Sequence, residues 1–163
     1  MKILAFDQST VKTGWAVFED GRFVESGVFD VHKEKDVDQR SQQMYKFLVS
    51  KAQSVRPDVV VAEEVSLQNP NVKTIVELAR VQGLVQASAY SSPLHPSVIF
   101  YTPSQWRKAV GIQTGRGIKR TELKKASIQM VAEQYNKLVS DDEADAILIG
   151  QAACSLSMEN KEI

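Results

Sequence analysis

Cysteine and histidine are scarce in this sequence. Its 163 residues include a single cysteine, Cys154, and two histidines. One cysteine cannot form an internal disulfide and suits a reducing compartment, and the two residue types together are too few for a zinc site. A chain of this length can bury roughly 70% of the surface that its unfolded form exposes, so it needs neither a disulfide nor a structural metal to fold. We expect one domain that spans residues 1–163.

Long apolar runs and an excess of charge of either sign are also missing. No run approaches the roughly 20 apolar residues of a membrane span, and Met1-Lys2-Ile3 leads directly into strand-like sequence rather than into a signal peptide. We therefore expect a cytoplasmic protein that does not contact a membrane. The 20 basic and 20 acidic residues balance, which excludes a generally cationic nucleic-acid coat protein but not a local basic face.

Apolar runs predict five strands. Residues 3–6, 14–18 and 23–31 are apolar or β-prone and are separated by polar turns. The second of these turns contains Asp20-Gly21, a strong hairpin signal, so we expect a three-stranded antiparallel meander. Residues 59–62 form an apolar run rich in valine, which is typical of a strand covered on both faces, and a short strand follows at residues 98–101.

Helical spacing of apolar residues predicts the helices. The first covers residues 38–54 and is closed by Arg56-Pro57, and two others cover residues 72–90 and 119–136. The last helix opens at Ser140-Asp141-Asp142-Glu143, which fits a Ser-x-x-Glu capping box. This order of strands and helices indicates an α/β protein with a mixed sheet and helices on its faces.

Basic residues concentrate in one stretch of this neutral chain. Residues 105–125 include seven basic residues and one acidic residue, Glu122, so the stretch carries a net charge of plus six. Gly111, Gly115 and Gly117 lie within it and predict a mobile loop between helices. Such a segment can follow a phosphate backbone without reading bases; the simpler alternative is a solvated basic face.

Two acids of the last helix occupy positions where a charge is costly. Asp145 falls on the same apolar stripe as Leu148, Ile149 and Ala152. A buried ionised acid is tolerated only with a cation or strong hydrogen-bond donors. Asp142 lies three residues earlier on the same side and adds a second negative charge. A divalent cation would resolve both problems.

Two further acids end apolar strands. Asp7 follows the first strand run and Glu63 follows the run at residues 59–62. Oxygen donors from three separate elements suit a hard cation such as Mg²⁺ or Mn²⁺. Two such ions can generate a hydroxide nucleophile and stabilise the leaving oxygen of a phosphodiester, so the pattern indicates a nuclease. Asp141 and Glu143 have a simpler interpretation, because acids in the first turn of a helix complement its dipole.

Short motifs along nearly the whole chain carry a family resemblance. They are Ile3-Leu4-Ala5-Phe6-Asp7, Thr13-Gly14, Arg56-Pro57-Asp58 before the strand that ends at Glu63, Leu78-Ala79-Arg80 with Gly83, Thr102-Pro103-Ser104-Gln105, and Ala144-Asp145-Ala146. In combination the sequence resembles the RuvC-type Holliday-junction resolvases of the ribonuclease H-like superfamily, and more closely their phage-encoded branch. The resemblance implies a ribonuclease H-like mixed five-stranded sheet, with three antiparallel strands and then two parallel ones, flanked by helices.

The same resemblance implies an activity and its residues. The family consists of dimeric, Mg²⁺-dependent endonucleases that make symmetric nicks in four-way DNA junctions. Matching its motifs makes four acids the catalytic, metal-binding carboxylates, with Glu64 as the alternative to Glu63: they are Asp7, Glu63, Asp142 and Asp145. We expect two Mg²⁺ ions per site, with Mn²⁺ as a substitute. Lys119 and Arg107 correspond to basic residues that approach the scissile phosphate, where a cation offsets developing charge.

The expected partners are branched DNA and a second copy of the chain. Six basic residues are candidates for DNA binding: Arg107, Lys108, Arg116, Lys119, Arg120 and Lys124. A junction presents two equivalent strands, so paired cuts require a two-fold homodimer. The helix at residues 72–90 is the expected interface, because Ala79, Gly83 and Ala87 would let two helices approach closely. A phage-encoded protein would act in the host cytoplasm.

Three positions depart from the family pattern. The usual Asp-Pro-Gly after the first strand is Asp7-Gln8-Ser9, Glu64 stands where a neutral residue is common, and Ser66 replaces the aromatic residue expected three positions after the catalytic Glu. Stacking of a base on an aromatic side chain is worth about 1 to 3 kcal/mol. We therefore expect relaxed branch selectivity, with cleavage of forks and flaps as well as four-way junctions.

Two other functions remain open. One is another ribonuclease H-like nuclease that acts on RNA or on RNA-DNA hybrids, because the carboxylate chemistry would be the same. The other is an actin-like ATP-binding domain in which residues 7–10 form a phosphate loop. The length argues against the second, because such proteins pair two domains.

Overall fold

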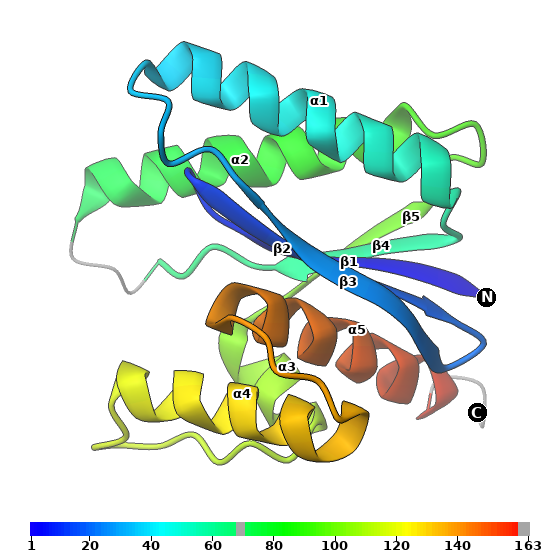
Figure 1. Ribbon diagram of the computed structural model, residues 1–163, viewed down its shortest axis with the longest axis vertical. Coiled ribbons are helices and arrows are strands. Elements are labelled where there is room, and N and C mark those ends of the chain that lie inside the picture. The colour runs from blue at the N-terminus through cyan, green and yellow to red at the C-terminus, as the bar shows by residue number, and fades with distance from the viewer. Residues whose placement is uncertain (68–70, 160–163) are drawn as a thin grey trace.

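The fold is built on one mixed sheet (Figure 1). The computed structural model describes residues 1–67 and 71–159. The strands of the described sheet are β1 (Lys2–Gln8), β2 (Lys12–Glu19), β3 (Arg22–Asp30), β4 (Val59–Glu63) and β5 (Ser97–Tyr101), in the order β3-β2-β1-β4-β5. β1 pairs with β2, and β2 with β3, in the antiparallel sense, whereas β1 pairs with β4, and β4 with β5, in the parallel sense. The expected mixed five-stranded sheet is confirmed.

The tight turn between β2 and β3 follows from its two residues. Asp20 and Gly21 both have positive φ, at 50° and 77°, which is the backbone of a two-residue hairpin turn whose twist matches that of the strands. β4 is covered on both faces, and Val60, Val61 and Ala62 are buried completely. The apolar run without alternation therefore has the burial that a central parallel strand requires.

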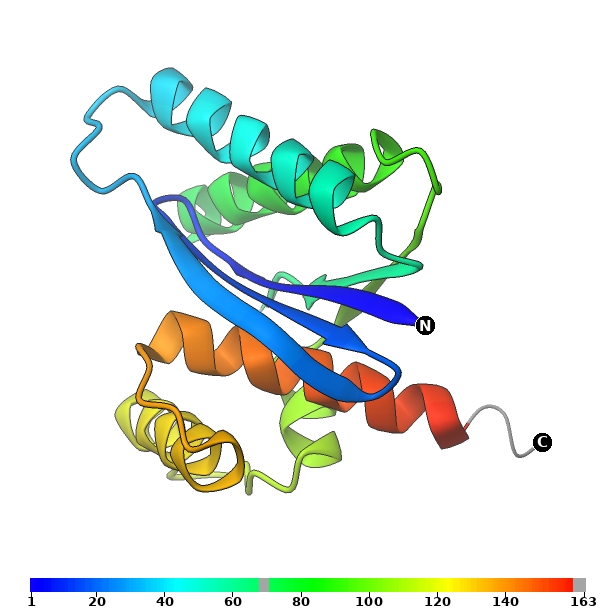
Figure 2. The ribbon, with the colours of Figure 1, turned by 45° about the vertical axis from the view of Figure 1, so that its right-hand side comes forward.

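The helices divide between the two faces of the sheet. α1 (Val37–Val55) and α2 (Val72–Tyr90) lie on one face, and α5 (Asp141–Glu159) lies on the other. α3 (Pro103–Ala109) and α4 (Arg120–Tyr135) pack on the outer side of α5 (Figure 2). α1 ends where Arg56 adopts a left-handed conformation just before Pro57. None of the described helices is both long enough and apolar enough to cross a bilayer.

Two details of the helices differ from the sequence interpretation. The expected order omitted α3, although the sequence encodes its start. The Thr102 hydroxyl accepts from the Gln105 backbone N–H, the Gln105 side chain accepts from the Thr102 backbone N–H, and Pro103 occupies the first turn. At α5 only half of the expected capping box forms. Ser140 Oγ accepts from the Glu143 N–H at 3.3 Å, but the Glu143 carboxylate accepts instead from Ser26 Oγ at 2.6 Å and pairs with Lys137. A lysine and a hydroxyl bind the carboxylate better than one backbone N–H does.

Two glycines allow α5 to lie close against the sheet. A Cβ at Gly150 would lie 2.5 Å from a ring carbon of Phe18. A Cβ at Gly14 would lie 1.9 Å from the backbone oxygen of Asp142, so the start of α5 rests directly on β2. The close approach matters because Gly14 pairs with Asp7 across the sheet.

Candidate active site

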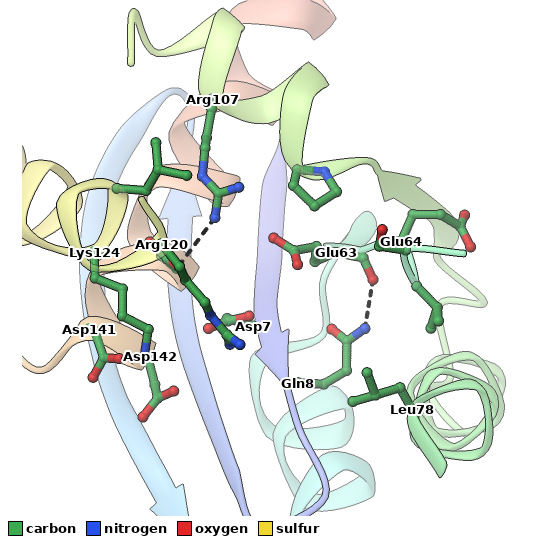
Figure 3. Close-up of a pocket in the computed structure, with 15 residues that line it drawn as sticks. Asp7, Gln8, Glu63, Glu64, Leu78, Arg107, Arg120, Lys124, Asp141 and Asp142 are labelled. Carbon is green, nitrogen blue, oxygen red and sulfur yellow. Dashed lines mark hydrogen bonds and ion pairs between the residues drawn. The ribbon is translucent and has the colours of Figure 1, made fainter. Parts of the chain in front are cut away.

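A pocket of about 290 Å³ opens at the carboxyl ends of β1 and β4, beside the start of α5. Phe6 pairs with Ala62 in the parallel register, so the next residues, Asp7 and Glu63, leave neighbouring strands at the same level. Charged side chains from five elements and one loop line the pocket (Figure 3): the acids are Asp7, Glu63, Glu64, Asp141, Asp142 and Asp145, and the cations are Arg107, Arg120 and Lys124. The structure thus brings the four predicted carboxylates to one place.

Asp7 lies among the other carboxylates. Its pKa is raised well above the usual value, first by burial and then by the negative charges of Asp145, Glu63 and Asp142, while Arg107 opposes the shift. Only groups close to one another interact in this way. The four acids therefore form one electrostatic cluster with too little positive charge around it.

The acids around Asp7 are perturbed in the same direction. Burial is the main cause that raises the pKa of Glu63, of Asp145 and of Asp142. Asp145 is the most buried of them, with 8% of its surface exposed. Its Oδ1 has no hydrogen-bond partner of good geometry among the described residues, although the Ser127 hydroxyl is near enough to lower its pKa. A buried carboxylate oxygen without a donor is costly, so this site favours an added cation or a proton.

Arg107 supplies part of the missing positive charge. Its guanidinium lies 3.8 Å from Asp145 Oδ2, and both side chains are largely buried. Arg107 Nε is itself buried without a hydrogen-bond partner among the described residues. The side chain therefore enters the carboxylate cluster (Figure 3) without satisfying all of its donors, which leaves it able to turn to an anionic ligand.

Glu63, and not Glu64, is directed to the cluster. The indole Nε1 of Trp106 donates to Glu63 Oε2 at 2.8 Å, and Gln8 Nε2 donates to the Glu63 backbone oxygen at 2.6 Å. Glu64 accepts from Gln82 of α2 at 3.0 Å, and Figure 3 shows it turned away from Asp7. The geometry favours Glu63 over the alternative that the sequence left open.

Asp141 lines the same pocket but is neutralised by a lysine. Lys124 donates to Asp141 Oδ2, and this hydrogen bond lowers the pKa of Asp141. The sequence interpretation gave Asp141 only a helix-dipole role. The ion pair adds a structural role, because it joins α4 to the start of α5.

The pocket cations differ in part from those expected near the scissile phosphate. Lys119, the residue matched to the family, is exposed and is not among the residues that line the pocket; its backbone N–H donates to Glu122 at 2.7 Å. Lys108 and Arg116 are also exposed and outside the lining. The lining cations come from α3 and α4 because the loop at residues 110–119 turns the start of α4, and with it Arg120 and Lys124, toward the acids.

The donor set fits a hard divalent cation, but the side chains do not form a ready ligand cage. Among the described residues, no group of three or more Asp, Glu, His or Cys side chains stands arranged to hold a metal ion. The cluster nevertheless offers only oxygen donors, as Mg²⁺ and Mn²⁺ prefer, and Asp145 Oδ1 lacks a partner. Metal binding therefore requires side-chain movement, above all of Arg107 away from Asp145.

Trp106 is a site residue that the sequence did not reveal. Its side chain is completely buried. Its hydrogen bond to Glu63 was missed, because β4 and α3 are brought together only by the tertiary fold. The Thr-Pro-Ser-Gln motif at residues 102–105 was the available signal, since it begins the helix that carries Trp106 and Arg107.

Comparison with known proteins identifies one family. The model of the family "Crossover junction endodeoxyribonuclease RuvC" matches residues 3–153. Among curated relatives, proteins of that name from Syntrophomonas wolfei and Caldanaerobacter subterraneus are 28% and 27% identical, over 96% and 94% of this chain and 88% and 92% of theirs.

Solved structures share the fold. Thermus thermophilus RuvC in complex with a Holliday junction substrate superposes with a TM-score of 0.76 at 17% identity, covering 97% of this chain and 96% of that chain. The fowlpox virus resolvase in complex with Holliday junction DNA superposes with a TM-score of 0.60 at 20% identity, covering 97% and 99%. The sheet order, the pocket acids and the match over residues 3–153 lead to one conclusion: the chain belongs to the RuvC family of crossover junction endodeoxyribonucleases.

Proposed function

We propose that this protein is a Holliday-junction resolvase, an endonuclease that nicks branched DNA by metal-dependent phosphodiester hydrolysis. One observation carries the proposal: in a chain of the RuvC family, Asp7, Glu63, Asp142 and Asp145 line one pocket. The family resemblance of the motifs and the junction complexes named for Thermus RuvC and the fowlpox resolvase support the choice of substrate.

In this proposal the four acids are the metal-binding carboxylates. Asp7 lies at the centre, because its pKa responds to each of the other three. These acids would hold divalent cations, which would supply a water-derived nucleophile and stabilise the leaving oxygen. The raised pKa values support the assignment, because a cluster that disfavours its own ionisation in the absence of metal gains most when a cation enters.

Three basic side chains of the pocket bind the phosphate of the DNA backbone in this proposal. Arg107, Arg120 and Lys124 line the pocket, and a guanidinium can bind two phosphate oxygens at once. Arg107 is best placed to contact the scissile phosphate, since it is already inside the cluster. The exposed Lys108, Arg116 and Lys119 would extend the DNA-binding face beyond the pocket, with Lys119 approaching the scissile strand only when DNA is bound.

The proposed homodimer uses α2. Its outward side carries Val76, Ala79, Gly83 and Ala87, all exposed, and a Cβ at Gly83 would meet nothing within 4 Å. A stripe of small residues on an open helix face permits close helix pairing. Two copies would present two pockets to the two equivalent strands of a junction.

Further features of the resemblance belong to the same proposal. They are a single domain over residues 1–163, two Mg²⁺ ions per site with Mn²⁺ as a substitute, a place in the phage-encoded branch and action in the host cytoplasm. The relatives named above are bacterial proteins, so the genes that flank this one would test the phage origin. Relaxed selectivity is proposed because the exposed Ser66 offers no aromatic face.

The experiment is a substrate panel. The wild-type protein and an Asp145→Asn variant are incubated with labelled four-way junctions, forks, flaps, linear duplex and RNA-DNA hybrid, with and without Mg²⁺. We expect only the wild type to nick the junction, and only with Mg²⁺ present. Forks and flaps should be nicked more slowly. Preferred cleavage of the hybrid would favour the alternative ribonuclease, and cleavage by the Asp145→Asn variant at the wild-type rate would contradict the assignment of the site.

A further inference from the structure

Two consecutive residues of α3 contact carboxylates that come from opposite sides of the pocket. Trp106 Nε1 donates to Glu63 Oε2 at 2.8 Å, and Glu63 belongs to β4. Arg107 lies 3.8 Å from Asp145 of α5. The Arg107 guanidinium also lies 4.4 Å from the centre of the Trp106 ring, so the contacts form a continuous chain from Glu63 through Trp106 and Arg107 to Asp145.

The indole is held rigidly. Trp106 is fully buried in the core cluster that α5 also joins. α3 begins with a reciprocal capping box between Thr102 and Gln105 and has Pro103 in its first turn, which fixes the start of this short helix. An N–H on such a support has little freedom, so the oxygen that it binds is fixed as well.

The hydrogen bond occupies one of the two carboxylate oxygens of Glu63, Oε2. A neutral donor that binds one carboxylate oxygen stabilises the charge and fixes the rotation of the group. The second oxygen is then left for the pocket, into which Figure 3 shows the Glu63 carboxylate pointing.

We propose that Trp106 is a positioning residue for the metal site: its N–H orients Glu63 as a ligand, and its ring face keeps the Arg107 guanidinium at the pocket when that guanidinium moves off Asp145. This inference rests on the proposed metal-dependent nuclease. Among side chains, only tryptophan combines a ring N–H with a broad, strongly cation-binding aromatic face. The two roles can therefore be separated, because Trp106→Phe keeps a ring face and loses the donor, whereas Trp106→Gln keeps a donor and loses the ring.

The first test compares Mg²⁺ dependence. In Trp106→Phe we expect the Mg²⁺ concentration for half-maximal junction cleavage to rise about 10-fold, as for other hydrogen-bond partners of metal ligands, while the metal-free junction Kd stays within about two-fold. Trp106→Gln should recover part of the Mg²⁺ affinity. In a Glu63→Gln background, Trp106→Phe should cause no further change. A variant that loses cleavage and stability but keeps the wild-type Mg²⁺ midpoint would overturn the proposal in favour of a packing role.

The second test does not depend on cleavage. The chain has two tryptophans, so Trp15→Phe leaves Trp106 as the single indole reporter. We expect Mg²⁺ to change the Trp106 emission saturably, and this response to be lost in Glu63→Gln and kept in the matched control Glu64→Gln. A response that survives Glu63→Gln would refute the inference. If the emission responds as expected but no branched DNA is cleaved, the proposed function fails while the positioning role stands.

Discussion

The first five residues of α5 carry two kinds of acid. Asp141 is paired with Lys124, and that hydrogen bond lowers its pKa. Asp142, the next residue, has its pKa raised by burial and by the neighbouring charge of Asp141. The pKa values of these adjacent acids thus shift in opposite directions, because Asp141 accepts a hydrogen bond from a lysine, whereas burial and the charge of Asp141 act on Asp142.

The same division separates Glu143 from Asp145. Glu143 pairs with Lys137 and accepts from Ser26. In contrast, Asp145 keeps one oxygen without a well-formed hydrogen bond to the described residues, and its pKa is raised by burial despite Ser127 and Arg107. Acids that already have a lysine hold elements together. Acids that lack sufficient positive charge are the ones available to bind a cation.

The largest expected effect on junction cleavage comes from comparing two variants, one with a substituted pocket acid and one with a substituted lysine-paired acid. Asp145→Asn should lower junction cleavage at saturating Mg²⁺ by at least about 100-fold, since even the partners of metal ligands cost 10- to 100-fold. Asp141→Asn should stay within a few-fold of the wild type, because it removes only a partly exposed ion pair. Single-turnover rates measure both, and equal losses would erase the distinction between the two acids.

The next effect concerns how Asp142 reaches the pocket. Gly14→Ala would place a methyl 1.9 Å from the Asp142 backbone oxygen, so α5 must shift, at a cost of about 1 to 3 kcal/mol and with a large loss of cleavage. Gly115→Ala is the matched control, since its Cβ would meet nothing within 4 Å. Chemical denaturation measures both variants. An unchanged Gly14→Ala protein would disprove the close contact between β2 and α5.

A smaller effect appears in the pH dependence of the metal-free protein. The folded-state pKa of Asp7 is raised, so its contribution to stability is present below the unfolded pKa of about 4 and is lost as the pH rises through the folded pKa. The melting temperature of Asp7→Asn should therefore rise relative to that of the wild type as the pH increases from about 4 to 8.

Mg²⁺ supplies the control for that comparison. At neutral pH, Mg²⁺ should raise the melting temperature of the wild type and leave that of Asp7→Asn nearly unchanged. The wild type should then be the more stable protein with Mg²⁺, whereas Asp7→Asn should be the more stable one without it. An Asp7→Asn protein that is less stable than the metal-free wild type at pH 8 would contradict the electrostatic account of the cluster.

The smallest effect is expected at the paired acid Glu143. Glu143→Gln should lower the free energy of unfolding by about 1 kcal/mol, since its pair with Lys137 is only partly buried, with cleavage unchanged. Thermal melting and junction cleavage together check this. A cleavage defect without a loss of stability would move Glu143 into the group of metal-binding acids.

Sequence reasoning located the carboxylates because the point at which an apolar run ends is local information. Asp7 and Glu63 each end an apolar run, and adjacent parallel strands bring such ends together. Asp142 and Asp145 followed from helical periodicity. The positions of the cations depended instead on the path of the loop at residues 110–119, so Lys119 was expected at the pocket where Arg120 and Lys124 lie.

Contacts between elements set the remaining limits. The Trp106 hydrogen bond and the Gly14 contact each join segments that are far apart in the chain, and no spacing pattern encodes such pairs. The Glu143 side chain could accept either from the backbone N–H at the start of α5 or from Lys137. The tertiary fold places Lys137 beside it, so the ion pair with Lys137 forms.

The most direct test of the central claim is a crystal structure of the protein soaked in Mn²⁺, with anomalous scattering used to locate the ion. We predict an anomalous peak in the pocket within bonding distance of Asp7 and of at least one of Glu63, Asp142 and Asp145, with Arg107 moved away from Asp145. A pocket without a peak, while Arg107 keeps its contact with Asp145 and the crystals hold Mn²⁺ elsewhere, would contradict the account.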